Sequence, residues 1–498
     1  MVRVTGLLLV LLYHFYKTIF PGGFVGVDVF FTFSGYLITA LLIDEYSKHR
    51  KIDLLGFYRR RFYRIVPPLV LMVLMVIPFT YLVRRDYVAN IGTQIAAALG
   101  FTTNFYEIMT GGNYESQFVP HLFLQTWSLA IEMHFYLIWG WLIWFLGRRR
   151  HSLAQFRSMI FGISGLFFLG SFLSMFIRVF FVDNVSTIYF SSLSHSFPFF
   201  LGAMVATMTG VRETTVRFKK NVRLWTTKRS IITMATSFAL LMVLGLTLNF
   251  NHRITYWFGF LLASLFAVVM IYGARVLNDQ LPNAKEPVVI NYLSDISYGI
   301  YLFHWPFYVI FTQLMPHFLA VLLTVFFSIV LSTLSYYLLE PFIAGKSPSL
   351  LGVEFDLTPY KKWIYGGTAA LGLVTLVTVL MAPSMGNFES SLLVNSLNQE
   401  QSNVTRTHTL TAGDAAALSD VTIIGDSVAL RSSSAFSSLL PDAQLDAAVS
   451  RNFNEAFDIY KNAIDSGTLS KTTVLAVGVN SLDNYREDLQ RFIDALPN

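Results

Sequence analysis

The sequence contains no cysteine. This absence excludes a disulfide framework, thiol catalysis and any metal site built on cysteine. Charged residues are also scarce, at 13% of the 498 residues, whereas hydrophobic residues make up 54%. Soluble domains carry about 25% charged residues, so this composition indicates a polytopic membrane protein. The first apolar stretch lacks a small-residue cleavage site, and we therefore do not interpret it as a removed signal peptide.

Eleven apolar stretches are long enough to be predicted membrane spans. They lie at about residues 4–20, 24–44, 65–83, 126–146, 157–181, 188–209, 230–249, 254–274, 293–314, 318–339 and 363–382. Lysine and arginine cluster in alternate loops, and basic loops are typically cytoplasmic. The pattern predicts a multi-pass protein of the cell membrane, with a cytoplasmic N-terminus and an extracytoplasmic C-terminal region. These loops account for the net charge of +6, and we expect no nucleic-acid partner.

Two ionisable residues lie in the first apolar stretch, Arg3 and His14. At ~100° per residue, eleven positions place both side chains on one helical face, about 16 Å apart along the axis. Ionisable groups inside a membrane span are costly and usually mark a functional site. The alternative is an interfacial anchor for Arg3 and a hydrogen-bonded structural role for His14.

Three later spans carry further candidates. Asp28 enters the second span at a depth where it could pair with His14, or it could simply face a helix N-terminus. Glu132 lies about two turns inside the fourth span, with Tyr136 at i+4 on the same face. A buried glutamate beside a histidine can act as a general base, whereas a structural contact between helices is the alternative. His304 lies beside a predicted proline kink.

The segment at 57–64, FYRRRFYR, is a basic amphipathic stretch on the predicted cytoplasmic side. It could anchor the protein to anionic lipid. It could also bind a phosphate-rich donor, because guanidinium groups bind phosphate through two hydrogen bonds. The sequence leaves both interpretations open.

Several motifs in order along the chain resemble the integral-membrane acyltransferase family 3, over about residues 1–345. They are Arg3 with ten residues between it and His14, then GGFVGVDVFFTFSGYLIT, FYRRRFYRIVPP, TWSLAIE, SYGIYLFHWP and LLEP. The resemblance implies O-acylation of extracytoplasmic glycans from cytoplasmic acetyl-CoA, with the functional arginine and histidine of the family at Arg3 and His14. The chain departs from the family pattern in its few residues before Arg3 and in Met133-His134, where Glu-Gln is common.

The last hundred or so residues are polar and differ from the rest of the chain. They predict a water-soluble part joined to the membrane domain by a Ser/Asn/Thr-rich flexible linker. The predicted division is a membrane domain at 1–345, a connecting segment with the last span at 346–383, a linker at 384–419 and a small α/β domain at 420–498.

Within the small domain, a predicted strand at 421–424 leads into Gly425-Asp426-Ser427. A serine at a strand-to-helix turn is exposed at the top of a sheet, near backbone N–H groups that can bind an oxyanion. A second predicted strand, at 473–477, ends in Gly478-Val479-Asn480. A purely structural turn is the alternative for each motif.

The pair of motifs resembles the SGNH hydrolase/esterase superfamily, and such a domain after a family-3 membrane domain is the arrangement of peptidoglycan O-acetyltransferases. The resemblance implies Ser427 as nucleophile, at the turn with Gly425 and Asp426, with Gly478 and Asn480 on the oxyanion side. The Asp-x-x-His pair of the superfamily is absent, since no histidine follows His408. A serine without a base is a poor nucleophile, so we expect either a truncated sequence or an inactive external domain.

Together these observations predict a mostly α protein, a polytopic helical bundle of about eleven spans followed by a small, incomplete α/β domain of SGNH type. The predicted function is that of an O-acetyltransferase that moves acetyl groups from acetyl-CoA to hydroxyls of cell-wall peptidoglycan, with no bound cofactor and no metal. Arg3, His14 and Glu132 would act in the membrane, Tyr136 as a candidate acyl relay and Ser427 outside. The alternatives are acylation of lipopolysaccharide or exopolysaccharide, a transporter, and a membrane-tethered esterase.

Overall fold

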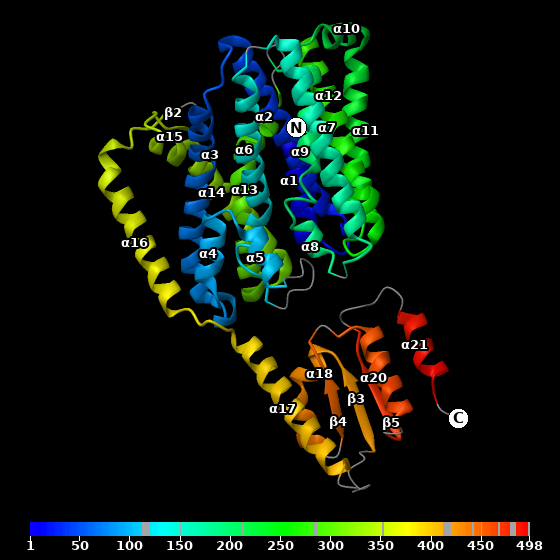
Figure 1. Cartoon of the computed structure of the whole chain (residues 1–498). Coiled ribbons are helices and arrows are strands. Elements are labelled where there is room, and N and C mark those ends of the chain that lie inside the picture. The colour runs from blue at the N-terminus through cyan, green and yellow to red at the C-terminus, as the bar shows by residue number, and fades with distance from the viewer. Residues whose placement is uncertain are drawn as a thin grey trace. The chain divides into compact units, whose positions relative to one another are not determined.

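The computed structural model divides into two compact units, Met1–Ala382 and Pro383–Asn498. The first is helical and the second is a small α/β unit (Figure 1). The structure describes residues 1–111, 119–149, 151–182, 184–211, 214–282, 286–350, 353–411, 420–440, 443–449, 451–466, 469–478 and 485–496.

Eight helical segments among these residues are long and apolar enough to cross a membrane, as expected for a multi-pass membrane protein. They contain α2 (Gly26–His49), α3 (Leu54–Val76), α6 (Thr126–Gly147), α7 (Leu153–Arg178), α11 (Thr227–Thr247), α12 (Phe260–Gln280), α14 (His317–Leu334) and α16 (Lys361–Met381). α16 contacts α3, α4 and the 3-10 turn at Ile77–Leu82 that follows α3. In that turn the Tyr81 hydroxyl lies 2.8 Å from the hydroxyl of Thr378 on α16.

Three other helices lie at the remaining predicted spans, namely α1 (Val2–Phe15), α9 (Phe197–Thr209) and α13 (Val288–Leu314). With 14 and 13 residues, α1 and α9 are each about 20 Å long and shorter than a ~30 Å hydrocarbon core. α13 has 27 residues, but polar groups such as Asp295 and His304 interrupt its apolar character. Arg3, His14 and His304 therefore lie on elements that differ from ordinary apolar spans, whereas Asp28, Glu132 and Tyr136 lie on the long apolar helices α2 and α6.

The first unit also contains short α-helices and strands, besides short 3-10 and π-helical turns. The short α-helices and strands are α4 (Ile91–Leu99), α5 (Thr103–Met109), α8 (Ser186–Tyr189), α10 (Val216–Leu224), α15 (Glu340–Ile343) and the antiparallel strands β1 (Ser349–Leu350) and β2 (Val353–Glu354).

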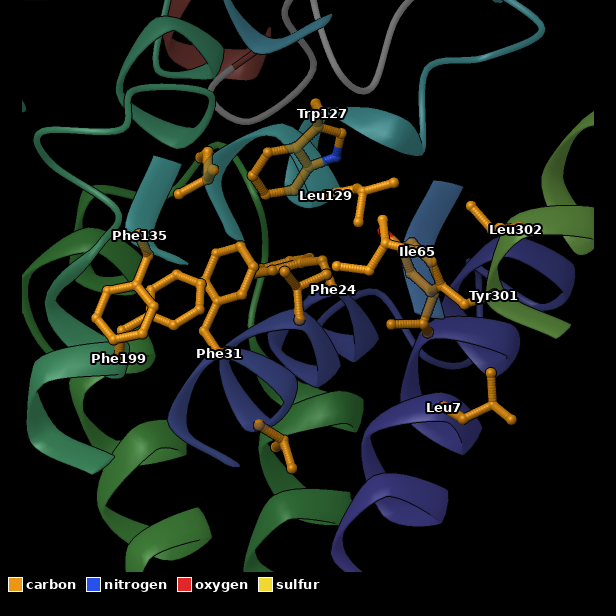
Figure 2. Close-up of a cluster of buried hydrophobic side chains, with 14 of the residues drawn as sticks. Leu7, Phe24, Phe31, Ile65, Trp127, Leu129, Phe135, Phe199, Tyr301 and Leu302 are labelled. Carbon is orange, nitrogen blue, oxygen red and sulfur yellow. The ribbon is translucent and has the colours of Figure 1, made fainter. Parts of the chain in front are cut away.

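Helix α2 packs against α9 at backbone contact. A Cβ placed on Gly35 would lie 1.9 Å from the carbonyl oxygen of Phe199, and one on Gly202 would lie 2.0 Å from that of Thr32. Small residues permit this close approach between membrane helices. Beside this contact, the rings of Phe31 and Phe135 both stack on the ring of Phe199 (Figure 2). Their centroids lie 4.3 and 4.5 Å from the Phe199 centroid. The position of α2, which lines the site described below, is thereby constrained.

The second unit is built on a parallel three-stranded sheet in the order β4-β3-β5. Its elements are α17 (Asn387–Thr411), β3 (Val421–Gly425), α18 (Ser427–Arg431), α19 (Ser433–Leu439), β4 (Gln444–Ala447), α20 (Phe453–Asp465), β5 (Thr472–Ala476) and α21 (Tyr485–Asp494). Strands β3 and β5 lie where the sequence predicts them. β4 was not predicted, because three of its four residues are only half-buried and two of these are the polar Gln444 and Asp446.

The segment at 384–419, predicted to be a flexible linker, contains the helix α17. Asn395 of α17 donates a hydrogen bond to the carbonyl of Leu430, at 3.2 Å. The side chain of Gln399 both donates to and accepts from the backbone of Ala447, at 3.0 Å each way. Polar side chains of this segment thus bind the backbone of the α/β unit.

Candidate functional site

A cavity of about 120 Å³ lies between α1, α2, α3, α6 and α13 in the first unit. Its lining includes four ionisable residues, Arg3, Arg61, Arg64 and Glu132. Hydroxyl groups line it as well, from Ser34, Ser128, Tyr136, Ser297, Tyr298 and Tyr301. So many polar groups inside a membrane protein are typical of a functional site rather than of helix packing.

Glu132 is held by two hydroxyl groups within the cavity. Ser34 of α2 donates to Oε1 at 2.5 Å, and Tyr136 donates to the same oxygen. The predicted i, i+4 neighbours on α6 are therefore in contact. A tyrosine hydroxyl hydrogen-bonded to a carboxylate is a nucleophile beside a base, the arrangement that covalent acyl transfer requires.

Of the three arginines, only Arg64 is engaged by an acidic side chain in the described parts of the chain. Its Nη1 lies 2.7 Å from Oε2 of Glu340, and its Nη2 donates to the carbonyl of Asp295 at 3.1 Å. Arg3 lies over the ring of Phe33, 5.0 Å from its centroid. Arg61 lies over the ring of Tyr136 at 5.9 Å.

Arg3 and Arg61 form no ion pair with any residue that the structure describes, and the buried Nε of Arg61 has no hydrogen-bond partner there. Arg3, Arg61 and Arg64 outnumber the one carboxylate, that of Glu132, in the lining of this cavity, and guanidinium groups without an ion pair favour binding of an anionic group.

A second, more open cavity of about 420 Å³ adjoins the first. Arg64 lines both cavities, so they meet at its side chain. The lining also includes Arg60, Tyr336, Glu340 and Lys346. The sequence singled out the basic stretch at 57–64 but did not place Arg61 and Arg64 among the catalytic candidates, although its arginine cluster was a usable signal.

His14 does not line the cavity that contains Arg3. Its Nδ1 lies 2.8 Å from Nε2 of His304 on α13, and its ring centroid lies 4.6 Å from that of Trp305. Arg3 and His14, predicted to share one face of α1, therefore lie in two separate polar environments: Arg3 at the cavity and His14 beside His304. His304, predicted as a further candidate, is the partner of His14.

The predicted pairing of Asp28 with His14 is wrong. Oδ1 of Asp28 lies 3.1 Å from Nε2 of His195, and both side chains are fully buried. The cause is helix packing, because α2 packs against α9 and His195 lies two residues before α9 begins. The interruption of an apolar run by Ser194-His195-Ser196 was the signal for this pair.

In the second unit, Ser427 is the first residue of α18 and directly follows the turn after β3. The side chain of Asp426 accepts a hydrogen bond from the backbone N–H of Val428 at 2.9 Å and caps the helix. Gly425 pairs in register with Ala476, so Gly478 follows β5 at the same edge of the sheet as Ser427. Asn480 lies outside the described residues.

The Ser427 side chain is buried, with 2% exposure, and not exposed as predicted. α18 packs so closely on β3 that a Cβ on Gly425 would lie 2.2 Å from the Cβ of Ala429. Within the described chain, its hydroxyl has no hydrogen-bond partner, so no general base contacts it there. No group of three or more histidine, aspartate or glutamate side chains that could hold a metal occurs among the same residues.

Comparison with known proteins identifies the chain. A family profile described as an acyltransferase domain matches residues 1–340. The O-acetyltransferase OatA of Staphylococcus aureus (strain NCTC 8325 / PS 47) is 26% identical over 98% of this chain and 81% of its own length. The putative peptidoglycan O-acetyltransferase YrhL of Bacillus subtilis is 28% identical over 68% of this chain and 53% of its own.

Peptidoglycan O-acetyltransferase OatA of Listeria monocytogenes is 24% identical over 68% of this chain and 54% of its own length. No solved structure matches the chain. The profile covers more than half of the chain, and the OatA match extends over nearly all of it. The predicted resemblance is confirmed: the chain belongs to the acyltransferase family and is homologous to the OatA peptidoglycan O-acetyltransferases.

Proposed function

We propose that this acyltransferase transfers acetyl groups from cytoplasmic acetyl-CoA to hydroxyl groups of cell-wall peptidoglycan. The observation that carries the proposal is the cavity at which Arg3 and Arg61 form no ion pair within the described chain. Attack on a thioester places negative charge on the carbonyl oxygen and then on the departing sulfur. Guanidinium groups fixed beside that charge stabilise the transition state. Similarity to the OatA proteins supports peptidoglycan as the acceptor.

The donor would enter through the more open cavity. There Arg60, Arg64 and Lys346 supply positive charge, which suits the phosphates of coenzyme A because guanidinium groups bind phosphate through two hydrogen bonds. Glu340 accepts from Arg64 in this structure, and a bound phosphate would compete for the same guanidinium group. The thioester would then reach the inner cavity beyond Arg64.

In the inner cavity, Tyr136 would accept the acetyl group. Glu132 takes the proton of the Tyr136 hydroxyl, and the phenolic oxygen forms an ester bond to the acetyl carbonyl carbon. The carbon–sulfur bond breaks, and coenzyme A leaves as a thiolate beside Arg3 and Arg61. His14 would act as the base for transfer to the next hydroxyl, and Ser427 would carry the acetyl group to the sugar.

The orientation belongs to the same proposal. An arrangement of eleven membrane helices, the eight long ones with α1, α9 and α13, places the N-terminus in the cytoplasm and the second unit outside. The basic loops support this orientation. It puts the arginine-lined cavities on the side where acetyl-CoA is available and Ser427 on the side of the glycan.

The arginine role is tested with the full chain in membrane vesicles supplied with radiolabelled acetyl-CoA and peptidoglycan. We predict that Arg61→Gln lowers acetyl transfer by about 10²-fold, because one charged donor to the developing anion is lost. Arg59→Gln is the matched control, since this exposed neighbour on α3 lines neither cavity. Wild-type transfer by Arg61→Gln would refute the proposal.

A further inference from the structure

We propose that His304 is a positioning residue that holds His14 in one tautomer, with the proton on Nδ1 and the basic lone pair on Nε2. The inference rests on the proposed function, in which His14 is the base of a transfer step. It assigns the basic atom to Nε2 of His14 and gives His304, the buried histidine of α13, a role in the reaction.

The hydrogen bonds of His304 determine which of its nitrogens carries the proton. Its Nδ1 lies 2.7 Å from the carbonyl oxygen of Tyr301 and 3.2 Å from that of Ile300. A carbonyl oxygen only accepts hydrogen bonds, so Nδ1 of His304 must be the donor. In the neutral ring, Nε2 of His304 is then an acceptor.

The same reasoning extends to His14. Its Nδ1 lies 2.8 Å from the accepting Nε2 of His304, so the proton between the two rings belongs to Nδ1 of His14. A neutral His14 therefore has its lone pair on Nε2. In catalytic histidines generally, an acceptor that binds the Nδ1–H group fixes the tautomer and the orientation of the ring. Here Nε2 of His304 is that acceptor for His14.

The fold holds His304 firmly enough for this role. Its side chain is fully buried, and Pro306 follows two residues later inside α13. Proline has no backbone N–H, so the carbonyl of Leu302 loses its helical donor. The side chain of Gln125 replaces that donor at 2.8 Å, which stabilises the irregular turn whose carbonyl groups bind His304.

In the step that follows, Nε2 of His14 accepts the proton of the incoming hydroxyl group. The hydroxyl oxygen forms a bond to the acetyl carbonyl carbon, the bond from that carbon to its carrier breaks, and the proton passes to the leaving atom. His304 contacts neither the hydroxyl nor the acetyl group in this scheme, because its two ring nitrogens are already engaged by Tyr301 and His14.

Two variants of His304 separate positioning from simple packing. His304→Gln keeps an amide oxygen near the position of Nε2 and can still accept from His14, whereas His304→Leu fills a similar volume without an acceptor. We expect His304→Leu to lower kcat for acetyl transfer by about tenfold or more and to leave KM unchanged. The loss is a fraction of the rate enhancement that a general base provides, because His14 remains but is no longer held in the correct tautomer. His304→Gln should restore most of the wild-type kcat.

A spectroscopic measurement does not depend on activity. Nitrogen-15 NMR of the full chain in membranes, with labelled histidine, distinguishes the two tautomers of His14, whose signals are assigned by their loss in His14→Gln. We expect Nδ1–H in the wild type and a mixed state in His304→Leu. Nε2–H in the wild type, or equal kcat values for the Leu and Gln variants, would overturn the proposal. Absence of acetyl transfer by a wild type with the expected tautomer would instead count against the proposed function.

Discussion

Single side chains determine the chemistry of the cavity, because hydrocarbon on the outside of the helices offers no partner for a charge. Glu132 accepts from two hydroxyl groups in this enclosed space. The carboxylate therefore orients Tyr136 toward the reaction proposed for it. Arg61, which lies over the Tyr136 ring, adds positive charge beside the same hydroxyl.

A prediction for a single side chain concerns Tyr136 as the acetyl relay. Tyr136→Phe keeps the ring under Arg61 and removes the hydroxyl, so acetyl transfer should fall by about 10²-fold or more, the scale of a lost nucleophile–base pair. The measurement is radiolabel transferred from acetyl-CoA to the chain and to glycan. Tyr58→Phe is the control, since the Tyr58 hydroxyl bonds to the Leu137 carbonyl at 2.8 Å, away from the cavity. Undiminished transfer by Tyr136→Phe would exclude the relay.

Among the helices, α2 contributes Ser34 and its neighbours to the cavity and depends on α9 for its position. The contact is made by backbone atoms rather than by large side chains. An interior as closely packed as this tolerates added volume poorly. The geometry of the cavity therefore depends on glycine residues that have no chemistry of their own.

Gly35→Ala tests this dependence. Alanine favours a helix over glycine by about 1 kcal/mol, yet here its Cβ would meet the Phe199 backbone. We predict a net loss of about 1–3 kcal/mol, as for other overpacked sites, seen as a lower unfolding temperature in detergent. Gly170→Ala on α7 is the control, because nothing lies within 4 Å of its added Cβ. An equal or higher unfolding temperature for Gly35→Ala would show that α2 and α9 are free to separate.

For the whole molecule, orientation across the membrane decides whether the proposed donor and acceptor are reached from opposite sides. α10 and its flanks carry several lysine and arginine residues between α9 and α11, whereas the second unit follows α16. The proposed arrangement places these two regions on opposite faces of the membrane.

Reporter fusions test this arrangement. A reporter inserted after Gly210 should be scored as cytoplasmic and one fused after Ser384 as extracytoplasmic, because basic loops are retained inside. A dual alkaline phosphatase and β-galactosidase reporter reads both sides in one assay. Both fusions on the same side would contradict the eleven-helix arrangement.

What the sequence determined by itself rests on local geometry and on ordered motifs. The apolar runs predicted the helical unit, and helical spacing brought Glu132 and Tyr136 together because neighbours at i and i+4 share a face in any α-helix. The motif order identified the acyltransferase family. The strand before Ser427 was predicted because a short buried strand has a recognisable composition.

The tertiary structure alone decided which distant groups meet. His14 pairs with His304 across 290 positions, and Asp28 with His195 across 167. Periodicity within one helix carries no information about the partner on another, because the choice depends on how whole helices pack and cross. The same holds for Arg61, which lines one cavity with Arg3 only because the fold brings α1 and α3 to that cavity together with α2, whose position depends on close contacts such as that of Gly35.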